Sequence, residues 1–127
     1  GKALIGRCYV CHKIGSAGVE FGPALAGWGS GQTRDVILKS ILHPSADISH
    51  GFEGTELIVK GDKKIQGFIQ AEGDPVVIRV FGGQDLVIAK ADINSRKQVK
   101  TSFMAPASRL GLSAQQLRDI VEYLKLN

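Results

Sequence analysis

The feature that most constrains this chain is the pentapeptide Cys8–His12, whose sequence is CYVCH. Two cysteines that are separated by two residues and followed directly by histidine form the pattern of c-type haem attachment. The two thiols can add to the two vinyl groups of one porphyrin, and His12 can then supply one axial nitrogen. The chain has no other cysteine. The pentapeptide therefore predicts one haem c, covalently attached through Cys8 and Cys11.

Length and charge limit the classes of protein to which the chain can belong. At 127 residues it has the size of one domain, or of one domain with an insert. The net charge of +4 comes from basic residues spread along the chain. Nucleic-acid-binding proteins cluster such residues, so we expect no nucleic-acid partner. No run of about 18 apolar residues occurs, which predicts no membrane-spanning segment.

The expected cofactor also predicts a location. Attachment of haem to this pattern takes place outside the cytoplasm in bacteria, yet the sequence shows no signal peptide. We therefore expect an export signal upstream of Gly1, and a periplasmic or otherwise extracytoplasmic protein.

Hydrophobic periodicity predicts helices near both ends of the chain and one between them. Residues 1–11 read as a short helix, and residues 13–32 as a glycine-rich loop. A second helix begins after a cap at Thr33 and ends at His43, because the residue before a proline leaves the helical region. The clearest helix follows a capping box that begins at Ser113.

After about Phe52, the spacing of hydrophobic residues changes from a helical period to the alternation that is typical of strands. The turn signal Gly61-Asp62 predicts a hairpin with a two-residue loop. We expect an antiparallel meander of four strands, with a fifth near residues 96–100. The four strands cover residues 55–60, 63–71, 76–81 and 85–90.

Four residues outside the pentapeptide are candidates for the same site. A haem-ligating histidine donates its other ring N–H to a fixed acceptor, and a backbone carbonyl near Pro23 would serve for His12. Leu25 lies in the same segment, and Trp28, the only tryptophan, is either an apolar wall of the site or plain core. Met104, the only methionine, lies in a loop and is a candidate second axial ligand.

These motifs together resemble class I cytochrome c. The resemblance rests on Cys8–His12, on the Gly-Pro-Ala-Leu-Ala-Gly run of residues 22–27, and on Met104 followed by an amphipathic helix. It covers residues 1–51 and 95–127. It implies a mainly α fold with inserted β structure, in which a helical core surrounds the covalent haem.

The intervening residues 52–94 are foreign to an ordinary cytochrome c. Segments 41–48 and 102–106, which flank them, resemble those of the Planctomycete/Verrucomicrobium-type haem-binding domain. In that family the methionine is followed directly by proline, whereas here Ala105 intervenes. The resemblance implies an inserted antiparallel β subdomain, and an electron-transfer module that serves, or is fused to, a dehydrogenase-like oxidoreductase.

The expected function is electron transfer rather than catalysis. Axial ligation by His12 and Met104 would leave no open position on the iron for a substrate. Two alternatives stay open. Weak binding of Met104 would suit a redox or gas sensor, and His43 or His50 could replace Met104 as the distal ligand.

The role of the β insert is also open. It is either a structural flap or a docking surface for an acidic partner. The second interpretation rests on basic residues near the first hairpin turn and before the methionine loop. These are Lys60, Lys63, Lys64, Arg96, Lys97 and Lys100.

Overall fold

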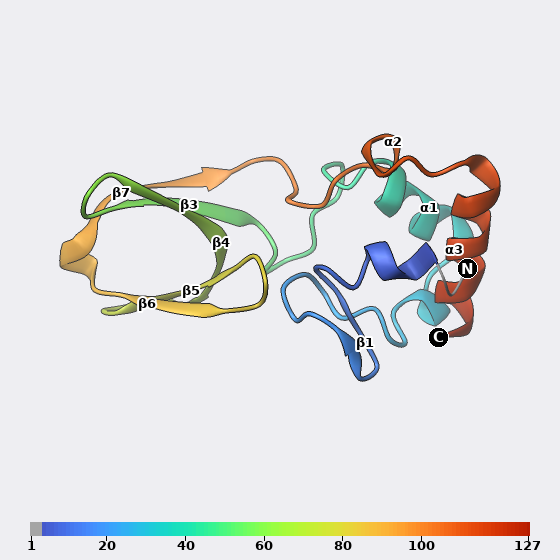
Figure 1. The fold of residues 1–127 in the computed structure, drawn as a ribbon, viewed down its shortest axis with the longest axis horizontal. Coiled ribbons are helices and arrows are strands. Elements are labelled where there is room, and N and C mark those ends of the chain that lie inside the picture. The colour runs from blue at the N-terminus through green and yellow to red at the C-terminus, as the bar shows by residue number, and fades with distance from the viewer. Residues whose placement is uncertain (1–3) are drawn as a thin grey trace. The chain divides into compact units, whose positions relative to one another are not determined.

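The computed structural model describes residues 4–127 and divides the chain into two compact units. Unit 1 comprises Gly1–Asp47 and Met104–Asn127, and unit 2 comprises Ile48–Phe103. Unit 2 thus extends beyond the predicted insert 52–94 at both ends. Figure 1 shows helices in unit 1 and a strongly curved sheet in unit 2.

Unit 1 is built from short helices and one small hairpin. Its two longer helices begin at the caps that the sequence predicts: the side chains of Thr33 and Ser113 accept hydrogen bonds from the backbone N–H groups of Val36 and Gln116. The Gln116 side chain completes the capping box at Ser113. The elements are η1 Leu4–Arg7, β1 Lys13–Ile14, β2 Ala17–Gly18, η2 Gly29–Gly31, α1 Arg34–Leu42, α2 Ala107–Leu110 and α3 Ala114–Leu126.

The core of unit 1 joins the two ends of the chain. Helix α3 contributes its apolar stripe, and α1 contributes Ile37 and Ile41. Ile5 of η1 is fully buried in the same cluster. The buried members are Ile5, Ile14, Ile37, Ile41, Ala107, Ile120, Val121 and Leu124. Burying such side chains is the main source of stability for helices too short to persist alone.

Unit 2 contains a five-stranded antiparallel sheet with the order β6-β5-β4-β3-β7. Its strands are β3 Gly54–Val59, β4 Lys63–Ala71, β5 Val76–Val80, β6 Asp85–Ile88 and β7 Ile93–Val99, with a short 3-10 helix η3 at Lys90–Asp92. The Gly61-Asp62 turn has positive φ at both residues, 84° and 58°. This is the backbone that a two-residue hairpin needs. The predicted hairpin is therefore present.

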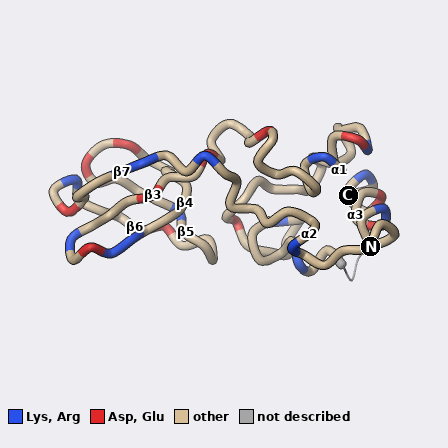
Figure 2. Tube along the Cα trace, turned by 90° about the horizontal axis from the view of Figure 1, so that it is seen from above, with Lys and Arg blue, Asp and Glu red and all other residues tan. Residues whose placement is uncertain are grey.

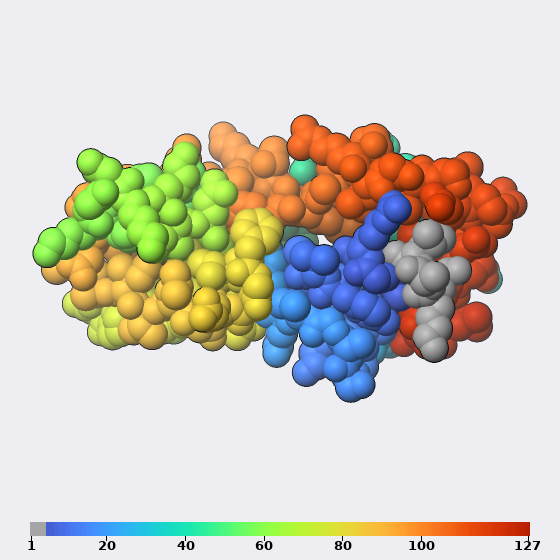
Figure 3. All heavy atoms as spheres, in the orientation of Figure 1, coloured from blue at the N-terminus to red at the C-terminus, as the bar shows by residue number. Residues whose placement is uncertain are grey.

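The first and last strands of unit 2 are neighbours in the sheet. Gly54 at the start of β3 pairs with Val99 at the end of β7. The chain thus enters and leaves the sheet at paired residues. An apolar core of Leu57, Val59, Ile65 and Ile78 lies on one face of the sheet. Figure 3 shows the heavy atoms of this unit, coloured green to orange, as one continuous surface.

Four phenylalanines form a second apolar group within unit 2. Phe68 lies 5.3 Å, between ring centroids, from both Phe52 and Phe103. Phe81 lies 5.5 Å from Phe103 in the same way. Such tilted and edge-on ring pairs are the arrangements that aromatic quadrupoles favour.

The predicted fold class, mainly α with inserted β, is wrong. The strands contain more residues than the α-helices. The helix predicted over residues 1–11 is only the 3-10 turn η1 within the described chain, and its first three residues lie outside the described range. The predicted loop 13–32 contains the β1–β2 hairpin, whose turn includes Gly15 at φ 61°. Short glycine-bearing segments do not supply enough successive hydrogen bonds for an α-helix, so tertiary contacts decide their conformation.

Candidate functional site

The pentapeptide Cys8–His12 folds as a tight turn directly after η1. The backbone N–H of Cys8 donates to Ile5 O at 2.8 Å, and the N–H groups of Cys11 and His12 both donate to Cys8 O, at 3.1 and 2.8 Å. These bonds place both cysteines on one helical turn. The local backbone therefore keeps the two cysteines and the histidine of the motif close together.

His12 is buried and held in one orientation. Its exposed fraction is 9%, and its Nδ1 lies 2.6 Å from Pro23 O. A carbonyl oxygen only accepts, so this hydrogen bond requires the proton on Nδ1 and leaves a lone pair on Nε2. The expected hydrogen bond between His12 and the Pro23 carbonyl is therefore present in the structure.

Burial also sets the protonation state of His12. Removal from water lowers its pKa below the ordinary histidine value of 6.5, and the hydrogen bond to Pro23 opposes this only in part. A lowered pKa keeps the imidazole neutral at neutral pH. His12 is therefore a fixed, uncharged nitrogen donor.

A glycine-containing segment closes over the histidine. The N–H groups of Phe21 and Gly22 both donate to Cys11 O, at 3.2 and 2.6 Å. A Cβ atom at Gly22 would lie 2.8 Å from His12 Cε1, closer than ordinary packing allows. At Gly18, where φ is 93°, a Cβ atom would collide with the carbonyl oxygen of His12. Both glycines are needed for the close approach of this segment.

Sequence reasoning missed the role of these two glycines. They were visible only as part of a glycine-rich loop, because composition does not show which glycine lies against which side chain. A usable signal was their position, since both lie within ten residues of the histidine that they enclose. The segment from Gly18 to Pro23 thus supplies backbone rather than side chains to the site.

The two cysteines are free thiols and are half-buried. Burial raises the pKa of both thiols, and the neighbouring Cys11 raises that of Cys8 further. Raised pKa values keep both groups protonated at neutral pH, so neither is an activated thiolate. The pair therefore lacks the electrostatic surroundings of a thiol oxidoreductase.

The remaining candidates lie in unit 1 and pack against one core. Leu25, Trp28 and Met104 are half-buried, and all three contact the hydrophobic cluster of that unit. Cys8 contacts the same cluster. Cys8, near the start of the chain, and Met104 thus pack against the same core. Trp28 serves as core here, which was one of its two interpretations.

The alternative histidines are placed differently from His12. His43 is exposed at the end of α1, where its backbone N–H donates to Lys39 O. His50 belongs to unit 2, and its fully exposed ring lies 3.8 Å from a carboxylate oxygen of Glu53. Neither ring has the buried, single-orientation setting of His12, so the structure gives no support to either as a ligand.

The cofactor prediction needs a correction. Among residues 4–127, no three His, Cys, Asp or Glu side chains gather into a group that could hold a metal ion. The site consists of two protonated thiols and one hydrogen-bonded histidine. It does not point to haem, and the prediction of one haem c attached through Cys8 and Cys11 is not upheld.

Comparison with models of known protein families, and with curated proteins, finds no match to this chain. Within residues 4–127, no helix has the length and apolar character needed to cross a membrane.

Proposed function

We propose that the chain is an electron-transfer domain and not an enzyme, and that it exchanges electrons with a redox partner protein or with a fused dehydrogenase domain. We propose an extracytoplasmic location for it. The observation that carries the proposal is the fixed, neutral imidazole of His12, with its Nδ1–H bound by Pro23 O. The resemblance of its motifs to class I cytochrome c supports it.

The donor atoms that we propose for a redox-active group are His12 Nε2 and the Met104 sulfur. His12 needs no reorientation to present its lone pair, because Pro23 O accepts the hydrogen bond from Nδ1 and Gly22 packs closely against the ring. A preorganised donor keeps structural change during electron transfer small, and the protein then contributes binding, orientation and electrostatics. Met104 is half-buried on the core of the same unit.

Voltammetry of the protein purified from the extracytoplasmic fraction of a bacterial host tests the proposal. We expect one reversible wave, which His12→Ala abolishes and Met104→Ala shifts to another potential. His43→Ala is the matched control, because His43 is exposed, and should leave the wave unchanged. If the unaltered protein gives no wave, the electron-transfer function is wrong. A wave that disappears on addition of carbon monoxide would favour the alternative of a gas sensor.

Intact-mass spectrometry of the same preparation examines what the protein holds. A mass equal to that of the sequence, with two thiols open to alkylation, agrees with the free cysteines of the structure. Added mass on both Cys8 and Cys11 would show that a group is covalently attached to these two residues.

A further inference from the structure

Unit 2 carries a buried carboxylate on the face of its sheet opposite to the apolar core. Leu57 and Val59 of β3 belong to that core. Because side chains alternate along a strand, Glu56 points to the other face. Its side chain is nevertheless only 7% exposed. A buried carboxylate in the middle of an apolar strand must be compensated by nearby donors or cations.

Three side chains from the neighbouring strands supply this compensation. The β-sheet register places Gln66 of β4 and Lys97 of β7 directly opposite Glu56. Gln66 donates to Oε1 at 2.9 Å, Lys97 Nζ lies 3.1 Å from Oε2, and Lys64 Nζ lies 3.6 Å from Oε1. The hydrogen bond from Lys97 is the main reason that the pKa of Glu56 is lowered. Glu56 therefore stays ionised and holds two ammonium groups near it.

Both lysines keep most of their surface in solvent. The Lys64 side chain is 62% exposed and the Lys97 side chain is 71% exposed. One buried negative charge thus fixes two exposed positive charges. The outward-facing charge of this group is positive.

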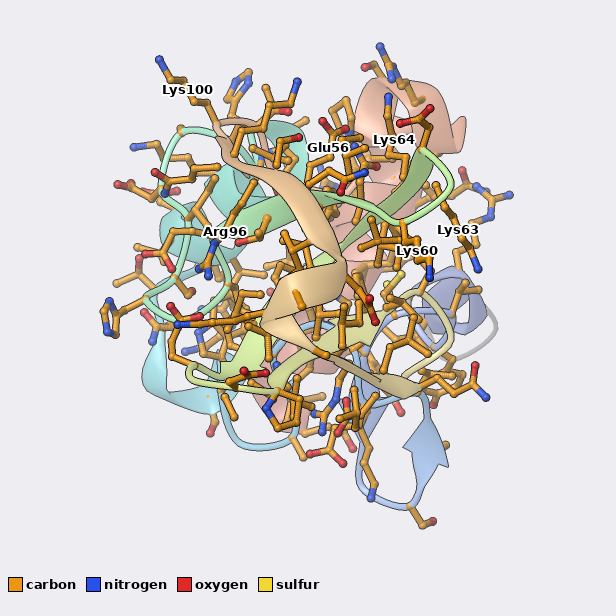
Figure 4. All side chains as sticks on the ribbon, turned by 90° about the vertical axis from the view of Figure 1, so that its left-hand side faces the viewer. Glu56, Lys60, Lys63, Lys64, Arg96 and Lys100 are labelled. Atoms are coloured by element: carbon orange, nitrogen blue, oxygen red, sulfur yellow. The ribbon has the colours of Figure 1, made fainter. Side chains whose placement is uncertain are left out.

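Two further lysines extend the positive surface to the end of the hairpin. Lys60 and Lys63 flank the Gly61-Asp62 turn and are exposed, and no ion pair joins either to another described residue. Figure 4 shows their side chains at the same end of the β3–β4 hairpin. Lys60, the residue directly after β3, is four residues from Glu56, or about 13 Å in an extended chain. We define the hairpin lysine cluster as Lys60, Lys63, Lys64 and Lys97; Lys63 is opposite the core residue Val59 in the register and joins the others at the end of the hairpin.

Arg96 and Lys100, which the sequence suggests as part of one basic rim, do not belong to this cluster. Arg96 pairs with Glu72 at 3.0 Å, and this carboxylate balances its charge. Figure 4 shows Arg96 and Lys100 away from Lys60 and Lys63. Elsewhere Figure 2 shows basic and acidic residues interspersed along the chain. The hairpin lysine cluster is therefore a local feature.

Protection against edge-to-edge aggregation does not explain the hairpin lysines. Charged residues commonly serve that purpose on the edge strands of a sheet. The edge strands here are β6 and β7, whereas Lys60, Lys63 and Lys64 belong to the hairpin that joins the interior strands β3 and β4. Three of the four lysines thus have no edge to protect.

We propose that the hairpin lysine cluster is a docking surface for an acidic protein partner. Four ammonium groups face two carboxylates, of which Glu56 is buried and Asp62 lies in the turn itself. Exposed charges of one sign steer association with a surface of the opposite sign and accelerate encounter. The identity of this partner as a redox protein rests on the proposed electron-transfer function, whereas the binding itself does not.

Binding of fluorescein-labelled poly-L-glutamate, measured by fluorescence anisotropy, tests the docking surface without any electron-transfer step. We expect binding at low ionic strength that weakens as salt is added, because exposed charges are screened. Lys60→Glu/Lys63→Glu should weaken it by about tenfold or more. The control Lys39→Glu/Arg118→Glu makes the same change in net charge on exposed residues of unit 1 and should weaken it far less.

Asp62→Asn provides a variant in the opposite direction. Asparagine tolerates the left-handed backbone at this position, where φ is 58°, so the turn is kept. Removing the exposed carboxylate should tighten poly-L-glutamate binding by a few fold. Equal loss of binding in both double variants would overturn the proposal, as would tighter binding to a DNA duplex or to anionic vesicles. A failed voltammetric test leaves these binding results unaffected, so the two proposals fail separately.

Discussion

The two units of this molecule are stabilised in different ways. In unit 2, each strand has a hydrogen-bonded neighbour, and the apolar core comes from three strands that follow one another in the chain. In unit 1, the core is assembled from Ile5 and α1 near one end and from α3 at the other. Most backbone of unit 1 between Cys8 and Thr33 is held by single loop hydrogen bonds. Apart from the pairing of β3 with β7, the sheet joins strands that are adjacent in the chain, whereas the unit with the candidate site depends on contacts between distant segments.

The largest expected effect comes from truncating one core at a time. Ile120→Ala in unit 1 and Leu57→Ala in unit 2 each remove a side chain that is at most 2% exposed. Each should cost about 2–5 kcal/mol of unfolding free energy, through lost burial and the cavity left behind. Fluorescence of Trp28, which lies in unit 1, should report the first change and not the second. Equal shifts of Trp28 fluorescence in both variants would show that the units unfold as one.

The next effect concerns the close approach at the site. Gly22→Ala should cost about 1–3 kcal/mol, because the new methyl group would lie 2.8 Å from the His12 ring. Thermal unfolding followed by Trp28 fluorescence measures the loss. Gly6→Ala is the matched control, since a Cβ atom there meets no other atom within 4 Å. If the two variants are equally stable, the enclosure of His12 contributes nothing to unit 1.

Loss of the α3 cap should have a smaller effect that is confined to unit 1. Ser113→Ala removes the hydroxyl that accepts the hydrogen bond from the Gln116 N–H, and it leaves the reciprocal bond from the Ser113 backbone N–H to the Gln116 side chain. We expect a loss of about 1 kcal/mol, measured by urea unfolding with the same fluorescence probe. Ser16→Ala, at an exposed residue outside any helix, should change stability very little. A loss of unfolding free energy in Ser16→Ala as large as that in Ser113→Ala would contradict the role of the cap.

The smallest expected effect is a dependence of stability on pH. Burial holds the pKa of folded His12 below 6.5, so the unfolded chain binds a proton first as the pH falls. The stability linked to His12 is therefore complete above pH 6.5 and declines as the pH decreases toward the folded-state pKa. Urea unfolding of unit 1 across this range should show the decline in the unaltered protein and in His50→Gln. The decline in unfolding free energy should be weaker in His12→Gln. An unchanged decline in that variant would show that groups other than His12 cause it.

Local signals predicted a large part of the fold. The caps at Thr33 and Ser113 and the Gly61-Asp62 turn act through hydrogen bonds or φ values within a few residues, so the sequence displays them directly. The predicted fold class was wrong because the prediction extended the family resemblance to segments whose own helical signal was weak. Residues 1–11 and the β1–β2 hairpin are examples.

The site shows the same limit. The hydrogen bond between His12 and Pro23 could be expected, because proline restricts the backbone only eleven residues away. The compensation of Glu56 by Lys64 and Lys97 could not, since it depends on the register of three strands. A one-residue slip of that register would place Glu56 on the core face. Register is set by the whole sheet and is not visible in any single strand.

The pairing of Gly54 with Val99 has a consequence for how unit 1 can form. Paired residues in an antiparallel ladder have their Cα atoms about 5 Å apart. Unit 2 connects the two segments of unit 1, whose core includes Ile5, Ile41 and Ile120. Once the sheet has folded, the ends of this long connection are held close together. The entropic cost of closing a loop grows with its length, so the folded sheet lowers the cost of bringing those segments together. An inserted subdomain can in this way raise the effective concentration of one segment of unit 1 for the other.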